Sequence, residues 1–230
     1  QRPSAGTVAL LVNDDGSEEL ILLSMIDGDN VVTVIDGSAR IRTVDLSASF
    51  DDVSGGAWFI ADADFVSARA LFKGTGAREF SGGALMTRGM LAEVFHRLAG
   101  SPSAAGNAFS DVPDSSWYRE SAKWAADSGV ILGMDGGFAG DENITREQLA
   151  AMAMRFAELV RADMGAPAEL TGFTDGSEVS AWATDAVKWA VGAGLLGGDE
   201  RSRLNAGGFA TRAEVAAVMR RFVENWVRAL

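Results

Sequence analysis

A pattern that occurs three times constrains the fold of this chain more than any other feature of its sequence. In each copy a Trp is followed, after about 30 residues, by a Thr-Arg pair. The paired positions are Trp58 and Arg88, Trp117 and Arg146, and Trp182 and Arg212. Self-similarity at a long, nearly fixed period is typical of stacked or pseudo-symmetric repeats. The sequence therefore predicts three similar units after an N-terminal segment of different character.

Further residues recur around the Trp and the Arg. Each copy opens with Phe and Asp, breaks at a glycine turn, and has another Phe shortly before the Thr-Arg pair. The opening residues are Phe50 and Asp52, Phe109 and Asp111, and Phe173 and Asp175; the turn glycines are Gly74, Gly133 and Gly198; the later Phe residues are Phe80, Phe138 and Phe209. Because glycine ends helices, each copy is predicted to be a helix, a turn and a second helix.

Apolar residues at helical spacing follow the Trp and the Thr of each copy, which predicts six helices with one apolar face each and a mainly α fold. The second helices have clear start signals. Thr145 and Gln148 have the spacing of a reciprocal capping box, as have Thr211 and Glu214. The first copy keeps the cap at Thr87 without the box.

Residues 1–46 are rich in Val, Ile and Leu and differ from the repeats. The apolar runs are Thr7 to Val12, Glu19 to Ile26, Asn30 to Ile35 and Ala39 to Leu46. Asp-Gly pairs separate these runs, and such pairs favour the tight turns of β-hairpins. We expect about four antiparallel strands in an up-and-down meander. So thin a sheet is either the tail of an upstream β domain or a sheet packed on the rest of the chain.

Small residues and proline mark the boundaries between units. We expect a β segment over residues 1–46 and repeats over 47–100, 107–163 and 171–228. The chain begins with neither an initiator Met nor a signal-peptide pattern, which favours a mature form or an excised fragment over a complete precursor.

Composition excludes several classes of function. The net charge is −12 and no basic run occurs, which argues against binding to nucleic acid or to an anionic membrane. No apolar run approaches the roughly 20 residues that span a bilayer. With no Cys and the single His96, the sequence predicts no metal site and no cofactor, and we expect His96 to be a partly buried structural residue.

The arginine of each Thr-Arg pair is unusual, because a cation in the first turn of a helix lies at the positive end of the helix dipole. One explanation is that each Arg pairs with a carboxylate such as Asp52, Asp111 or Asp175 and fixes the packing. The other is that Arg and the exposed helix amides form an anion site. The tryptophans form two groups. We expect Trp124 and Trp189 in the core, whereas core and ligand roles are about equally favoured for Trp58, Trp117 and Trp182.

The three copies resemble S-layer homology repeats, whose hallmarks are F-x-D-V, an early Trp, a G-[IL]-[IL]-x-G turn, a D-G-x-F loop and an I-T-R-A-E helix start. The resemblance covers residues 50 to about 226 and is strongest in the second copy, with Asp135 to Phe138 as its loop. In the first copy Phe65 replaces the second Trp and Ala70 replaces the first Gly of the turn. The third copy has Gly176 instead of Val and a longer loop from Asp199 to Gly208.

The resemblance implies a pseudo-threefold trefoil with a central helix bundle, whose grooves between adjacent repeats bind an acidic secondary cell wall polysaccharide, commonly one bearing pyruvate ketals. It also implies a secreted protein at the cell wall of a bacterium. The groove cations would be Arg88, Arg146 and Arg212; their polar partners Asp52, Asp111 and Asp175; the apolar walls Trp58, Trp117 and Trp182; and the points of close approach Gly74, Gly133 and Gly198. Among the arginines we expect Arg146, in the middle repeat, to matter most.

The leading hypothesis is therefore a non-catalytic anchor. The carboxylates fall at caps and turns, and tripled equivalent sites are typical of multivalent binding rather than of one active centre, so we expect no enzyme in this stretch. The alternative is a structural module of a surface layer that joins protein to protein, with self-association and no direct glycan binding. In that case the arginines would form salt bridges.

Overall fold

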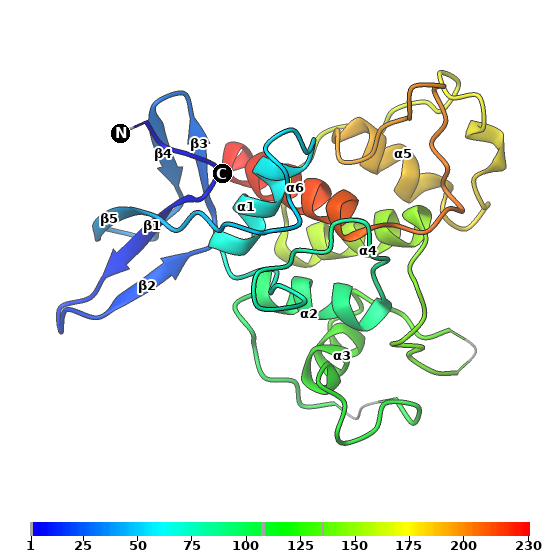
Figure 1. Cartoon of the computed structure of the whole chain (residues 1–230). Coiled ribbons are helices and arrows are strands. Elements are labelled where there is room, and N and C mark those ends of the chain that lie inside the picture. Colours follow the sequence, from blue (N-terminus) through cyan, green and yellow to red (C-terminus); the bar gives the residue numbers. More distant parts are fainter. Residues whose placement is uncertain (1, 107–108, 135) are drawn as a thin grey trace. The chain divides into compact units, whose positions relative to one another are not determined.

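The computed structural model describes residues 2–106, 109–134 and 136–230 (Figure 1). Asp135, the first residue of the D-G-x-F loop, and residues 107–108, where the second repeat was expected to begin, lie outside the described residues. The chain divides into two compact units. One comprises residues 1–84 with 212–230, and the other comprises Leu85–Thr211.

The described residues contain the mainly α fold and the small antiparallel β segment that the sequence predicts. The helices are α1 (Ile60–Ala68), α2 (Arg88–Leu98), α3 (Arg119–Asp127), α4 (Arg146–Val160), α5 (Thr184–Gly192) and α6 (Arg212–Ala229), with a short 3-10 helix at Gly176–Glu178. The Thr87 side chain accepts the Met90 N–H, and Thr145 forms the full capping box with Gln148. Both start signals are confirmed.

The β segment has five strands: β1 (Thr7–Val12), β2 (Glu18–Ile21), β3 (Ser24–Asp27), β4 (Asn30–Thr33) and β5 (Arg40–Asp45). The expected meander is wrong. One sheet has the order β2-β1-β5, and β3 pairs only with β4 among the described strands. The run from Glu19 to Ile26 is not one strand, because the Ser24 hydroxyl and N–H donate to the carbonyls of Ile21 and Leu22 and close a bend. The three Asp-Gly turns are confirmed: Gly16, Gly28 and Gly37 have positive φ angles.

A buried arginine attaches the β segment to α1. Arg69, at the end of α1, is fully buried, and its guanidinium lies 3.6 Å from the centre of the Phe65 ring. Its donors reach the carbonyl oxygens of Ser24 at 2.8 Å, Ala5 at 3.2 Å and Thr7 at 3.3 Å. Burial lowers the pKa of Arg69 to about 10. The β segment is thus packed on the helices of its own unit, where α6 also contacts β3.

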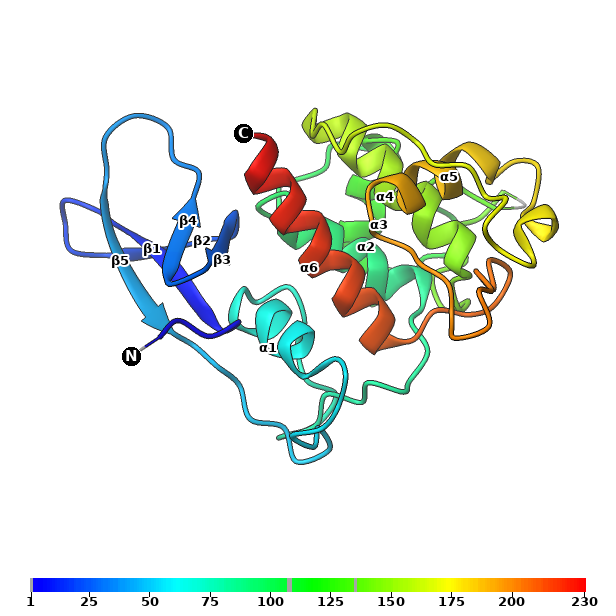
Figure 2. The same cartoon turned by 90° about the horizontal axis from the view of Figure 1, so that it is seen from above.

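Helices pair across the sequence repeats rather than within them. The second helix of one repeat packs on the first helix of the next: α2 on α3 and α4 on α5 in the unit Leu85–Thr211. In the other unit, α6 packs on α1, which closes the order from the third repeat to the first (Figure 2). Trp124 on α3 is buried as predicted, and its ring meets the ring of Phe156 edge-on at 6.3 Å.

A closed cycle of backbone hydrogen bonds joins the three residues that precede the Thr-Arg pairs. The Met86 N–H donates to Ala210 O at 3.0 Å, the Ala210 N–H to Ile144 O at 2.9 Å, and the Ile144 N–H to Met86 O at 2.9 Å. Each residue donates to one neighbour and accepts from the other. The second helices of all three repeats therefore begin close to this cycle.

Ala70 occupies a position where the other repeats have glycine. It has a φ of 53°, and the matching Gly129 and Gly194 have φ angles of 73° and 68°. A left-handed backbone is easy for glycine and costs roughly 1 kcal/mol for alanine. The first repeat therefore keeps the turn geometry although its sequence departs from the pattern.

Candidate ligand-binding groove

Arg88, the first residue of α2, is a structural clamp. Its side chain is almost completely buried, with 2% exposed. The Nε group donates to Phe138 O and the Nη2 group to Leu132 O, both at 2.8 Å. The guanidinium therefore ties the start of the second helix of the first repeat to the loop at residues 132–138 of the second repeat.

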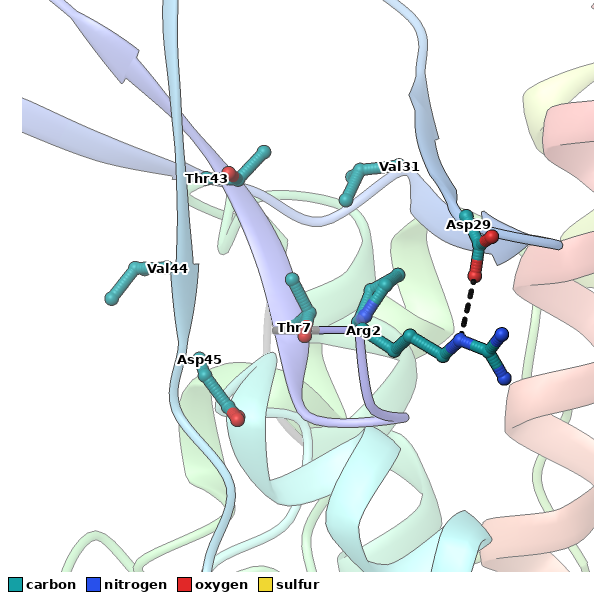
Figure 3. Close-up of a pocket in the computed structure, with 8 residues that line it drawn as sticks. Arg2, Thr7, Asp29, Val31, Thr43, Val44 and Asp45 are labelled. Carbon is teal, nitrogen blue, oxygen red and sulfur yellow. Dashed lines mark ion pairs between the residues drawn. The ribbon is translucent and has the colours of Figure 1, made fainter.

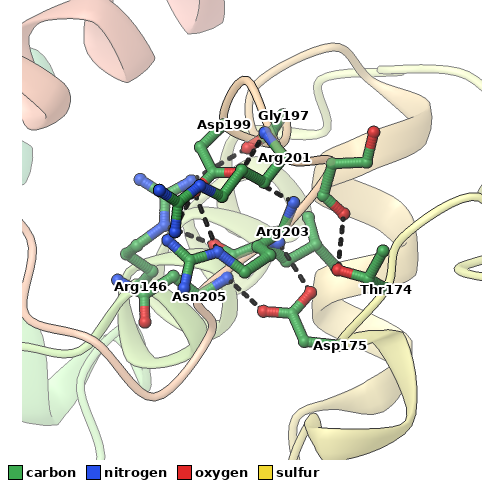
Figure 4. Close-up of polar contacts among 10 residues, drawn as sticks. Arg146, Thr174, Asp175, Gly197, Asp199, Arg201, Arg203 and Asn205 are labelled. Carbon is green, nitrogen blue, oxygen red and sulfur yellow. Dashed lines mark hydrogen bonds and ion pairs between the residues drawn. The ribbon is translucent and has the colours of Figure 1, made fainter.

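The other two arginines make the same clamp with the next repeat in cyclic order. Arg146 donates to Leu204 O at 2.8 Å and to Gly197 O at 3.0 Å (Figure 4). Arg212 donates to Phe80 O at 2.8 Å and to Lys73 O at 3.0 Å. The bonds to Phe138 O and Phe80 O are buried, so these two acceptors would otherwise lack a partner, whereas the second carbonyl of each clamp is part-buried or exposed. The Arg in the first turn of each helix is thus explained by its hydrogen bonds to the loop of the next repeat, which offset its unfavourable place at the positive end of the helix dipole.

The aspartates hold the same loop residues from the opposite side. Asp111 accepts the N–H groups of Phe138 and Ala139, both at 2.8 Å. Asp52 accepts those of Phe80 and Ser81 at 2.8 and 2.6 Å. Asp175 accepts those of Leu204 and Asn205, both at 2.8 Å. Each of the three loops therefore has one residue whose N–H binds the aspartate and whose C=O binds the arginine. These residues are Phe138, Phe80 and Leu204.

These contacts change the ionisation of the groups involved. Hydrogen bonds from the N–H groups of Phe138 and Ala139 hold the pKa of Asp111 below its ordinary value. For Arg88, burial is the largest cause of a lowered pKa, and the positive charge of Arg155 adds to it. Arg155 therefore lies close enough for its charge to act on Arg88.

The expected pairing of Arg with Asp does not take the form of a direct ion pair in two of the repeats. Among the described residues, Arg88 makes no ion pair with Asp111, and Arg212 makes none with Asp52. Each pair instead shares a backbone residue of the loop. The salt-bridge interpretation of these arginines is replaced by a clamp on backbone carbonyls.

The turn glycines are required by packing inside their own loops. A Cβ atom on Gly133 would lie 2.9 Å from the Phe109 ring, and one on Gly198 would lie 3.0 Å from the Phe173 ring. On Gly74 it would lie 2.8 Å from Glu79 O. Since such distances are too short for carbon, the opening Phe or the loop backbone explains each glycine.

Phe209 is not the counterpart of Phe138. The residue that Arg146 and Asp175 hold in the third repeat is Leu204, which lies eight positions before Arg212 as Phe138 lies eight before Arg146. Phe209 instead pairs with Thr145 in an isolated β-bridge and is 53% exposed. The extended loop expected in the third repeat is therefore wrong: Gly198 lies 14 residues before Arg212, as Gly74 lies 14 before Arg88, and the Phe position is taken by a Leu.

The three early tryptophans share one environment. Trp58, Trp117 and Trp182 are 64%, 62% and 58% exposed, although each is a large apolar side chain. Trp58 and Trp117 meet the aromatic ring of the following residue edge-on at 5.5 and 5.2 Å. Indole rings that are fixed on one edge and open on a face are suited to stacking against a ligand.

A groove of about 350 Å³ within the unit Leu85–Thr211 brings the predicted residue types together. Arg88 of the first repeat, Gly133 of the second and Trp182 of the third all line it. The loop residues Leu132 and Met134 and the α4 residues Gln148, Ala151, Met152 and Arg155 complete the lining. The groove therefore combines an apolar floor, two guanidinium groups, an amide and an exposed indole.

Sequence reasoning missed Arg155 and Gln148. Arg155 lies nine residues after Arg146, and arginines stand at the same offset in the other second helices, Arg97 after Arg88 and Arg221 after Arg212. That recurrence was a usable signal. A single Arg in the middle of a helix is otherwise typical of a solvated face.

A second hollow lies in the β segment and contrasts with the groove. It has a volume of about 260 Å³ and is lined by Arg2, Thr7, Asp29 and strand residues (Figure 3). Its one ion pair, Arg2 to Asp29 at 3.6 Å, joins side chains that are 89% and 75% exposed. An exposed pair of this kind contributes little to stability or recognition.

Among the described residues, no three His, Asp or Glu side chains are arranged to hold a metal ion. His96 has the structural role expected of it, since its Nε2 lies 2.8 Å from Pro102 O. Within the same residues, none of the helices combines the length and apolar character needed to cross a bilayer.

In each of the three repeats, the arginine of the Thr-Arg pair thus binds a loop of the next repeat in cyclic order. Comparison with known proteins agrees with this. The S-layer homology domain family matches residues 49–89, 108–150 and 172–216, and the chain belongs to that family.

Three relatives illustrate where such domains occur. The chain is 27% identical over 174 residues to exoglucanase XynX of Acetivibrio thermocellus, covering 75% of this chain and 16% of that protein. It is 30% identical over 172 residues to an endoglucanase of Bacillus sp. (strain KSM-635), covering 74% and 18%. It is 29% identical over 121 residues to the surface-layer 125 kDa protein of Lysinibacillus sphaericus, covering 51% and 10%.

The chain thus spans less than a fifth of the length of each of these relatives. Family membership and the surface-layer relative indicate a location at the bacterial cell surface.

Proposed function

We propose that this chain is a non-catalytic anchoring module that binds an acidic secondary cell wall polysaccharide, one bearing pyruvate ketals, in grooves between its repeats. The observation that carries the proposal is the groove at Arg88, Arg155 and Trp182. It offers positive charge, an amide and an exposed aromatic face within one hollow of sugar size. These are the groups by which proteins hold an acidic sugar.

The chemistry of each wall fits one part of such a ligand. The face of Trp182 can stack on the C–H groups of a pyranose ring. An accessible guanidinium group in the lining can bind a ketal carboxylate by charge-assisted hydrogen bonds. The Gln148 amide can donate to or accept from sugar hydroxyls. An acidic chain can therefore present a local cationic site to an acidic polymer.

We propose further that the repeats form a pseudo-threefold trefoil around a central helix bundle, with the repeat boundaries given above. Two cyclic relations support this. The backbone cycle through Met86, Ile144 and Ala210 has threefold character, and the arginine clamps run from each repeat to the next and from the third to the first. By this symmetry Arg146 and Arg212 would position the loop of the next repeat as Arg88 does.

The distribution of relatives favours attachment over catalysis. An exoglucanase, an endoglucanase and a surface-layer protein share this region, which is a small part of each. Proteins named for different tasks have in common a need to be held at one place. A module that supplies attachment, and no reaction of its own, fits that distribution.

The rival function is protein-protein assembly without glycan binding. It predicts that the exposed tryptophans bind another protein chain and that the wall polymer is irrelevant. No contact in the described residues specifically favours it over the glycan hypothesis. The two functions differ in what the groove must bind, and a wall-binding assay separates them.

The experiment is sedimentation of the purified chain with cell walls that retain their secondary polymer and with walls from which it has been extracted. We expect binding only to the walls that retain it. Trp182→Ala should weaken binding at unchanged helicity, and Trp124→Phe, a buried change outside the groove, serves as control. Equal binding to both wall preparations would refute the glycan function and favour assembly.

A further inference from the structure

We infer that Arg155, and not the arginine of the Thr-Arg pair, is the residue that selects acidic over neutral sugars in the groove at Trp182. Arg88 is then a positioning residue that shapes the loop. The inference rests on the proposed function and refines it, because it assigns the charge recognition of the groove to one side chain.

Arg88 is buried, and two of its donor groups already bind backbone carbonyls. Its Nε and Nη2 groups both donate to backbone carbonyls at 2.8 Å, and only 2% of the residue is exposed. Arg146 and Arg212 make the same two contacts. A side chain that does the same work in all three repeats cannot by itself distinguish a charged ligand in one groove.

Arg155 is different in each respect. It is half-buried on α4, lines the groove, and makes no hydrogen bond or ion pair with any of the described residues. None of the described residues that line the groove is acidic. Five N–H donors in a planar fork are free to bind a carboxylate or a phosphate in two-point fashion.

The position of Arg155 is also unfavourable for the protein on its own. Arg88 and Arg155 are like charges on the walls of one groove, and the charge of Arg155 acts on Arg88. Two like charges repel each other, and an anion bound between them relieves that repulsion. An arrangement that costs stability in the free protein is expected where a ligand of opposite charge binds.

The equivalent arginine of α2 provides an internal contrast. Arg97 forms an ion pair with Glu93, one helical turn earlier, at 2.8 Å. In α4 the residue one turn before Arg155 is Ala151, which leaves the guanidinium without that partner. Introducing the carboxylate by Ala151→Glu should therefore occupy Arg155 as Glu93 occupies Arg97.

The ligand class follows from this assignment. The groove should take a sugar with a carboxylate or phosphate placed to reach Arg155 while its ring stacks on Trp182. A ketal carboxylate on the terminal sugar and a phosphate on the polymer share that chemistry. The test uses two methyl hexosides, one with a 4,6-linked pyruvate ketal and one with a 6-phosphate, and the uncharged methyl ester of the ketal as the neutral probe.

The measurement must report this groove alone. Indole N–H signals in an NMR titration do so, with the Trp182 signal assigned by its loss in Trp182→Phe. We expect Arg155→Gln to weaken binding of the acidic probe about tenfold, the loss of one charge-assisted contact at a half-exposed site. Binding of the methyl ester should change less than about twofold. Ala151→Glu should act in the same direction.

Arg97→Gln is the matched control, since Arg97 is already paired, and it should leave the affinity read at Trp182 unchanged. Arg155→Gln should also leave the melting temperature equal or slightly higher, because a like charge is removed. If Arg155 had only a structural role, its replacement would lower the melting temperature.

The inference is overturned if Arg155→Gln binds the acidic probes as tightly as the parent chain does. The proposed function fails in a different way, namely if the parent chain shows no response at any exposed Trp to either acidic probe or to the polymer. A response to the ketal alone, or to the phosphate alone, identifies the acidic group that the groove accepts.

Discussion

Replacing Arg88 by Met tests the clamp that shapes the groove. Methionine keeps an unbranched apolar stem of similar length and removes every donor. The carbonyl oxygens of Phe138 and Leu132, now bonded at 2.8 Å, would lose their partners. Because only 2% of Arg88 is exposed, water cannot readily replace it.

The magnitude follows from those two contacts. The buried Phe138 O left without its donor costs about 1.5–2.5 kcal/mol, and the part-buried Leu132 O adds about 0.5 kcal/mol, together about 2–3 kcal/mol. Removing a buried charge that also repels Arg155 returns part of this, so we expect a net loss of about 2 kcal/mol. For a chain of this size, 1 kcal/mol corresponds to about 2–4 °C, and the melting temperature should fall by about 4–8 °C.

The assay is thermal unfolding followed by circular dichroism, with urea unfolding as a second measure. Arg155→Gln is the comparison, because it removes an arginine from the same groove without removing a clamp. A fall of less than about 1 °C for Arg88→Met, or an equal fall for both variants, would refute the division of roles between the two arginines.

Three further perturbations test other parts of the structure. The pKa of Asp111 is below its ordinary value of 3.8, so its contribution to stability is present above about pH 4 and lost as pH falls through the folded pKa; Asp111→Asn should flatten acid unfolding in that window. Gly133→Ala should lower stability by about 1–3 kcal/mol in urea unfolding, because the new Cβ meets Phe109, whereas Ala70→Gly should raise it by roughly 0.5–1 kcal/mol by relieving a left-handed alanine. Arg69→Met should speed amide hydrogen exchange in β1 and β3 with little change in α4, and unchanged exchange in these strands would contradict its role as their attachment.

Local features of this fold could be predicted from the sequence. The helix starts at Thr87 and Thr145 depend on a few neighbouring residues, and the predicted caps are present. The Asp-Gly turns are equally local, since positive φ angles at Gly16, Gly28 and Gly37 need only the turn itself. The threefold pattern is visible in the sequence because each repeat uses similar residues at its turns and at its helix starts.

Long-range partners could not be predicted in the same way. The pairing of β5 with β1 connects residues 28 to 38 positions apart, from Val12 with Arg40 to Thr7 with Asp45, and neither strand has a sequence feature that identifies its partner. The clamps reach farther, from Arg88 to carbonyls 44 and 50 residues away. Every residue has a backbone carbonyl, so the sequence does not show which carbonyls an arginine binds. From the sequence a carboxylate is a reasonable partner for each Arg, but the loop that each Arg binds cannot be identified.

The sequence predicts the residue types of the candidate site but not all of its residues. Arg88, Gly133 and Trp182 were each named from the repeat pattern, and the structure brings the three together from three different repeats. Arg155 could not be identified from the sequence, because its role depends on which side chains surround it in the folded protein. That it has no partner among the described residues becomes visible only when the neighbouring side chains are placed in three dimensions. The error at Phe209 arose from matching residue types, whereas the constant distance to the following Arg identifies Leu204.

The most direct test of the anchoring function is the affinity of the chain for secondary wall polymer before and after mild acid hydrolysis of its ketals. The polysaccharide backbone stays intact in this treatment, and only the acidic substituent is removed. We predict tight binding to the untreated polymer and a loss of at least about tenfold after hydrolysis, with Arg155→Gln losing most of that difference. Equal affinity for both polymers would contradict recognition of an acidic sugar by this domain.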